Sequence, residues 1–145
     1  MNRITDTVKH LLIINGIAFL ATSLYGSQLY NLLALHYYKN PLFQIWQPLT
    51  HMFLHGNFSH ILFNMIGLWM FGSPLEQLWG RNKFIFFYLS SGLGAAALQI
   101  LYSSYDFNSI FEILVNNGFN SEEIINTIET SRYNLNWLSY ISEQQ

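Results

Sequence analysis

The sequence has no cysteine and very few charged residues. Without cysteine the 145-residue chain forms no disulfide, and this absence leaves its redox compartment undetermined. Only 10% of the residues are charged, whereas an ordinary soluble domain carries about 25%. Three long stretches contain no Asp, Glu, Lys or Arg, namely residues 10–38, 40–75 and 84–105. Helices of a soluble protein need a charged outer face, so these stretches argue against a soluble helical domain.

Each uncharged stretch is long enough to cross a bilayer, because a span needs about 20 mainly apolar residues. The chain is also 51% hydrophobic and 17% aromatic. We therefore expect an all-α membrane protein with three transmembrane helices, near residues 8–26, 58–76 and 83–103. The first is too long and too aromatic at its end for a secretory signal, and it lacks a small-x-small cleavage site.

Basic residues near the span ends predict the orientation of the chain, because cytoplasmic loops are enriched in them. With three alternating spans, the side of the N-terminus carries four basic residues and the opposite side two: Arg3, Lys9, Arg81 and Lys83 against Lys39 and Arg132. We expect a multi-pass integral membrane protein in contact with the lipid bilayer, with its N-terminus in the cytoplasm.

Residues 104–145 differ in character from the rest. They carry six acidic residues and one basic residue, Arg132. Ser121 with two glutamates behind it is typical of a helix start, and Gly118 is suited to close a preceding helix. We expect a polar, acidic, helical extramembrane segment that follows a domain of residues 1–103. The chain has no basic patch for nucleic acid, so no nucleic-acid partner is expected.

His60 and Asn64 are polar residues in an otherwise apolar run, "HILFNMIGLWMF". Polar groups inside a span tend to face the bundle interior or a wet cavity, and two residues four apart share one helix face. They could join neighbouring helices by hydrogen bonds. They could also donate to a developing negative charge, as in an oxyanion hole. A metal site with His51 and His55 lacks helical register and a nearby carboxylate, so no metal is expected.

The stretch "WQPLTHMFLHGNFSHILFNMIGLWMFGSPLEQLWG", residues 46–80, closely resembles the rhomboid family of intramembrane serine proteases. The resemblance continues into "FYLSSGLGAAALQ", residues 87–99, which is similar to the third span of the family, and it covers roughly residues 8–103. The matching positions occur in the family's order: Trp46, Thr50, His51, His55, His60, Asn64, Gly72, Glu76 and Gly80.

The resemblance implies a fold, an activity and roles for single residues. Rhomboids cleave transmembrane protein substrates with a Ser–His dyad in a six-helix bundle and use no cofactor, and this chain is similar to the N-terminal half of that bundle. His60 and Asn64 would stabilise the oxyanion. Four residues would brace the site, with Glu76 bonding loop backbone groups near the end of the second span: Trp46, His51, His55 and Glu76. The style of the resemblance points to a bacterial cytoplasmic membrane.

The sequence departs from the family pattern in two respects. Gln47 follows Trp46, where many rhomboids have arginine, and this loses a charge that would order the loop. The nucleophile motif Gly-x-Ser-Gly and the base histidine of the sixth span are absent, and the nearest imitation is "LSSG", residues 89–92, on the third span. A nucleophilic serine needs an oriented base, and no histidine has a spacing that pairs it with Ser90 or Ser91.

Three hypotheses about function follow. The chain is the N-terminal part of a rhomboid intramembrane serine endopeptidase, cut short before its catalytic half, and is inactive alone. Alternatively, it is a non-catalytic rhomboid-like protein that binds other transmembrane helices. In the third hypothesis it is an inactive remnant, or one half that assembles with a separate C-terminal half.

Overall fold

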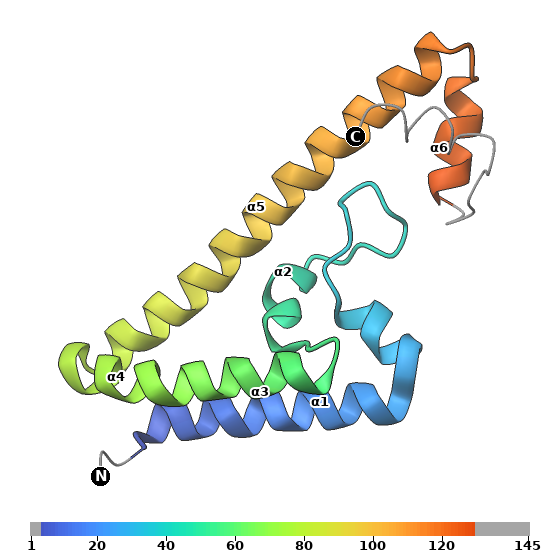
Figure 1. Ribbon diagram of the computed structural model, residues 1–145. Helices are drawn as coiled ribbons and strands as arrows, with labels where there is room; N and C mark the ends of the chain where they lie inside the picture. The colour runs from blue at the N-terminus through green and yellow to red at the C-terminus, as the bar shows by residue number, and fades with distance from the viewer. Residues whose placement is uncertain (1–3, 130–145) are drawn as a thin grey trace. The chain divides into compact units, whose positions relative to one another are not determined.

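The computed structural model describes residues 4–129, and these residues form helices and connections without any strand. This confirms the all-helical class that the sequence predicts. Arg3, Arg132 and Glu143, which enter the charge arguments above, lie outside the described residues. Figure 1 shows the helical elements in chain order: α1 (Asp6–Leu33), α2 (Gln47–Thr50), η1 (His51–Phe53), α3 (Phe58–Gly67), η2 (Leu68–Gly72), α4 (Ser73–Trp79), α5 (Arg81–Asn116) and α6 (Ser121–Glu129).

Within the described residues, two helices are long and apolar enough to cross a membrane, α1 with 28 residues and α5 with 36. The predicted second span lies within α3, η2 and α4, which follow one another without a gap, so that the backbone is helical from Phe58 to Trp79, as Figure 1 shows. η2 is a π-helical turn, a feature that is often found at functional sites. The first and third predicted spans are therefore single helices, and a second crossing by residues 58–76 stays a prediction.

The C-terminal end of α1 is held by the loop that follows it. α1 bends at Gly26, whose φ and ψ are 61° and −143°, and the bend is visible in Figure 1. The last carbonyls of a helix have no partner inside the helix. Here Trp46 Nε1 donates to the carbonyl of Leu32 at 3.1 Å, and Thr50 Oγ1 donates to the carbonyl of Leu33 at 2.7 Å.

Gln47 takes part in the same arrangement, which the sequence did not suggest. Its side chain is fully buried, and Nε2 donates to the carbonyls of Asn31 and Leu32, each at 3.4 Å. The expectation was that Gln47 in place of arginine would leave the loop less ordered. In this structure the neutral amide binds the end of α1 without a buried charge, which would be costly to desolvate.

Replacing Gln47 by alanine is expected to lower the free energy of unfolding by about 1–3 kcal/mol, because the buried side chain and its hydrogen bonds to the end of α1 would be lost. Thermal unfolding in detergent micelles, followed by circular dichroism, measures the loss. Gln28→Ala is the matched control, because Gln28 is an exposed glutamine on α1. Equal melting of the two variants would contradict the role assigned to Gln47.

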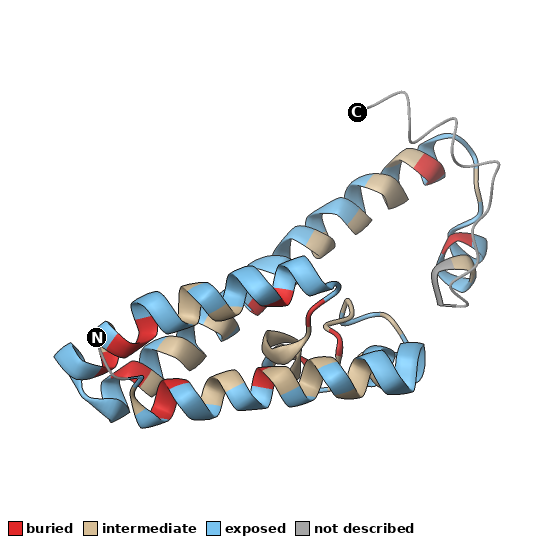
Figure 2. Ribbon diagram, turned by 60° about the horizontal axis from the view of Figure 1, so that its bottom comes forward, coloured by how far each residue is buried: buried red, intermediate tan, exposed pale blue. Residues whose placement is uncertain are grey.

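The first turn of α1, η2 and the start of α5 meet at Gly72. A β-carbon at this position would lie 2.9 Å from Val8 Cγ2 and 3.3 Å from Phe84 Cζ, so only glycine permits this approach. Buried residues are concentrated here, as Figure 2 shows in red where the start of α1 meets α4. Most of the remaining helical surface is exposed and apolar, as expected for helices whose surroundings are lipid.

α5 extends well past the predicted end of the third span at residue 103. The helix runs unbroken to Asn116, because no glycine or proline lies between Gly94 and Gly118. At about 1.5 Å per residue it is about 54 Å long, whereas a hydrocarbon core is about 30 Å thick. The boundary placed at residue 103 therefore does not coincide with a helix end.

The described residues form two compact units. One unit contains the residues up to 35 together with 44–96, and the other contains residues 36–43 together with those from 97 onward. α5 runs from the first unit into the second. All of the predicted site residues belong to the first unit.

The second unit contains a small helical hairpin. Leu114 and Ile124 are fully buried against each other. Gly118, with φ of 86°, follows the end of α5 as predicted. Asn120 Oδ1, rather than Ser121, accepts from a first-turn amide of α6, that of Glu122 at 2.8 Å. The predicted cap was therefore wrong by one residue, because an asparagine at the N-cap position competes successfully with serine.

Candidate functional site

His60 and Asn64 lie on α3, and the residue before the helix sets where that helix begins. Asn57 has an extended backbone and caps α3, its Oδ1 accepting from the His60 amide at 2.8 Å. His60 therefore lies in the first turn, where the amide dipoles of the helix favour negative charge. Asn64 follows one turn later on the same face. Both side chains are exposed in the described chain.

The imidazole of His55 lies beside that of His60. Their ring centroids are 5.1 Å apart and the rings meet edge to face. His55 is buried, and its Nδ1 has no hydrogen-bond partner within residues 4–129. Burial lowers the pKa of His55 from its ordinary value, and the charge that His60 would carry lowers it further. A neutral His55 therefore has an unused polar atom at the edge of the site.

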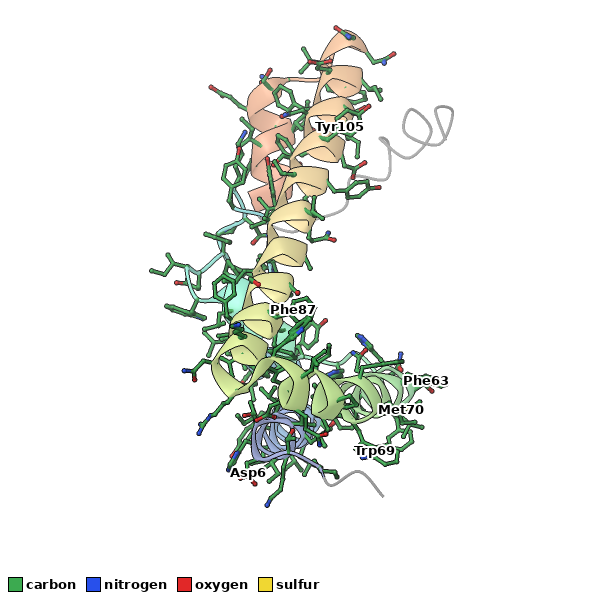
Figure 3. All side chains as sticks on the ribbon, turned by 90° about the vertical axis from the view of Figure 1, so that its left-hand side faces the viewer. Asp6, Phe63, Trp69, Met70, Phe87 and Tyr105 are labelled. Carbon is green, nitrogen blue, oxygen red and sulfur yellow. The ribbon has the colours of Figure 1, made fainter. Side chains whose placement is uncertain are left out.

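A cavity of about 370 Å³ lies next to these residues. Its walls come from α1, the loop of residues 44–57, the α3–η2 helix and the start of α5, and they are mainly apolar. Its polar lining residues are few: Asn15, His55, Asn64 and Tyr88. Phe63 and Phe87 also line it, and Figure 3 shows Phe63, Trp69 and Met70 together on the α3–η2 helix, away from Asp6. The cavity thus offers a few donors in apolar surroundings.

Asn15 and Tyr88 were missed in the sequence analysis. Asn15 is almost completely buried in the middle of α1, its Nδ2 donates to the carbonyl of Leu11 at 2.7 Å, and its side chain forms a hydrogen bond with Tyr88 of α5. A signal was present, because Asn15 interrupts the apolar run "LLIINGIAFL", and such interruptions mark polar contacts within a bundle.

The four predicted bracing residues have different partners. Trp46 contacts the end of α1, as described above. His51 Nδ1 lies 3.1 Å from the carbonyl oxygen of Gln47, one turn earlier in the loop. His55 contacts His60. Only the last of these contacts is made with a predicted oxyanion residue.

Glu76 has different partners from those expected. Its carboxylate accepts from Thr7 Oγ1 and, at 3.3 Å, from the backbone amide of Val8. The expected partners were loop backbone groups near the end of the second span. The buried carboxylate instead caps the first turn of α1, because unpaired amides and a positive dipole end favour an anion there.

The stretch nearest to the nucleophile motif, residues 89–92, lies within α5. Ser90 is exposed, and its hydroxyl donates to the carbonyl of Phe87 in its own helix at 3.1 Å. Within residues 4–129, no three or more His, Asp or Glu residues are grouped in a way that could hold a metal ion. The chemistry available in the described residues is thus hydrogen-bond donation from His60 and Asn64 beside an apolar cavity.

The comparisons with known proteins give one match. The family model described as the rhomboid domain matches residues 42–115, just over half of the chain. The matched region includes all six predicted site residues and most of the cavity wall. No curated protein and no solved structure matches the chain.

Proposed function

The chain belongs to the rhomboid family, and from this premise we propose that it forms the oxyanion-binding part of an intramembrane serine endopeptidase. The family and the two apolar helices indicate a membrane protein. The observation that carries the proposal is the placement of His60 and Asn64 on one face of α3, with Asn64 lining a mainly apolar cavity.

The chemistry assigned to these residues is stabilisation of the tetrahedral intermediate. During peptide-bond cleavage the scissile carbonyl oxygen gains negative charge, and preorganised donors in a water-poor site stabilise it strongly. An imidazole N–H of His60 and the amide of Asn64 are suitable donors. His55, in contact with His60, would orient that imidazole.

The nucleophilic serine and the base histidine are expected from a C-terminal segment outside these 145 residues. We propose that this segment packs against the cavity beside Asn64 and presents its serine there. Transmembrane proteins are the proposed substrates, and the bacterial cytoplasmic membrane, with the N-terminus in the cytoplasm, is the proposed location. Rhomboid-like binding without cleavage is the second candidate, favoured by the missing nucleophile motif.

The 145-residue chain alone is expected not to react with a serine-directed fluorophosphonate. The hydroxyl of Ser90 is bonded to its own helix, so no base activates it. In-gel fluorescence of the purified chain in detergent measures labelling, with an active serine hydrolase as the positive control. Labelling that disappears in Ser90→Ala or Ser91→Ala would show that the chain contains its own nucleophile.

The native gene product, isolated from membranes of its host, tests the proposal itself. Its intact mass and its fluorophosphonate labelling are measured together. A mass well above 16.9 kDa, with labelling at a Gly-x-Ser-Gly serine, would support the protease. A labelled partner chain that co-purifies with a 16.9 kDa product would support it as well. An unlabelled product that binds transmembrane helices would favour the non-catalytic candidate.

A further inference from the structure

Met52 lies where the β-carbon of a larger residue would be at position 92. A β-carbon built on Gly92 would lie 2.8 Å from Met52 Cγ and closer still to the sulfur and the terminal methyl group. Non-bonded carbon atoms approach each other to about 3.5–4.0 Å, so any side chain at position 92 would displace the thioether. The loop of residues 44–57 thus contacts the backbone of α5 through Met52.

In the sequence, Met52 lies between two predicted site residues, His51 and His55. Met52 is the central residue of η1, His51 is its first, and His55 follows shortly after. His51 shares this 3₁₀ turn with Met52, and His55 follows two residues after the turn ends. Met52 also lines the same cavity as His55 and Asn64.

The loop is therefore held at two separate points. Its first part is bonded to the end of α1 through Trp46, Gln47 and Thr50. These bonds leave the His51–His55 segment without a side-chain bond to α5. η1 also packs against α1, and the contact of Met52 with Gly92 joins the same segment to α5, which forms part of the cavity wall.

We propose that Gly92 is a positioning residue, which by lacking a side chain seats Met52 on α5 and so holds His51 and His55 in place beside His60 and Asn64. This role is independent of the proposed protease activity, because it concerns the geometry of the loop in the chain itself. The competing explanation is that Gly92 is one of several small residues that let α5 approach any neighbour closely. Gly94 is a control that distinguishes these two explanations, because a β-carbon at position 94 would meet no atom within 4 Å.

Disulfide formation tests the contact directly, because the chain has no cysteine of its own. The double variant Met52→Cys/Gly92→Cys places two β-carbons near the spacing of about 3.5–4.5 Å that disulfides require. It is expected to cross-link at least about tenfold faster than Met52→Cys/Gly94→Cys, whose second cysteine lies on another face of α5. Equal rates for the two pairs would overturn the proposal.

Changing the sizes of the side chains at positions 92 and 52 tests whether Gly92 positions the loop. Gly92→Ala is expected to displace Met52 and to abolish the lowering of the His55 pKa, measured by NMR titration of its imidazole protons in micelles. Gly94→Ala should leave that pKa unchanged, and Met52→Ala in the Gly92→Ala background should restore it. The same pKa in the Gly92→Ala and Gly94→Ala chains would overturn the proposal. If Gly92→Ala fails to fold, a double variant that also fails to fold would overturn it as well.

Discussion

Replacing Asn64 by alanine is expected to lower kcat of a catalytically competent assembly by about 10²–10³-fold, because one oxyanion donor is removed. The loss should fall on kcat rather than KM, since the carbonyl oxygen becomes negative only on the way to the transition state. His60→Ala is expected to have an effect of the same order. Steady-state cleavage of a transmembrane substrate in proteoliposomes measures both values.

The control for this prediction is Ser59→Ala, which changes an exposed residue next to His60 on α3. It should leave kcat near the wild-type value. In the proposed arrangement the two donors bind one oxygen, so the double variant His60→Ala/Asn64→Ala should lose less activity than the product of the single losses. If Asn64→Ala and Ser59→Ala cleave equally well, the oxyanion assignment is wrong.

Replacing Glu76 by alanine is expected to cause the largest loss of stability among single substitutions at the site, about 2–4 kcal/mol. The carboxylate is buried and accepts from Thr7 Oγ1 and from the amide of Val8. Hydrogen bonds to charged groups contribute about 1.5–3 kcal/mol, and each buried group left without a partner adds a further cost. Thermal or denaturant unfolding in micelles measures the difference.

Two variants show whether this loss comes from the hydrogen bonds. Glu76→Gln keeps an acceptor for Thr7 without the charge, so its stability should lie between those of wild type and Glu76→Ala. Asp6→Ala removes an exposed carboxylate from the same turn of α1, where its ion pair with Lys9 is 4.0 Å long. Such exposed pairs contribute little, so this variant should melt like wild type. A loss in Asp6→Ala as large as that in Glu76→Ala would attribute the effect to net charge instead.

The helical class and the first and third spans could be predicted because they depend on local composition. An uncharged apolar run such as residues 10–38 can satisfy its backbone in lipid only as a helix. The third span was predicted to end near residue 103, whereas α5 continues to Asn116, since the change from apolar to polar residues near Ser104 does not itself stop a helix. Gly118 does stop it, and that signal was read correctly.

The site was predicted only where residues act within one helix. His60 and Asn64 share a face because of their spacing, and this is fixed by helix geometry. The partner of Glu76 lies 69 positions earlier in the chain, at Thr7, and no local pattern indicates that pairing. Gln47 was interpreted as the loss of a charge, whereas in the structure its side-chain amide donates to the carbonyls of Asn31 and Leu32.

The sequence by itself determined that this chain is apolar and helical, and that its ordered motif from Trp46 to Gly80 belongs to the rhomboid family. Composition and motif spacing are properties of the chain read in order, so no structure was needed for them. The tertiary structure alone decided that Glu76 caps α1, that His55 lies against His60, and that Met52 is seated on Gly92. The Glu76 and Met52 contacts join residues far apart in sequence, and the His55 contact depends on how the loop enters α3, so only the folded chain sets these distances.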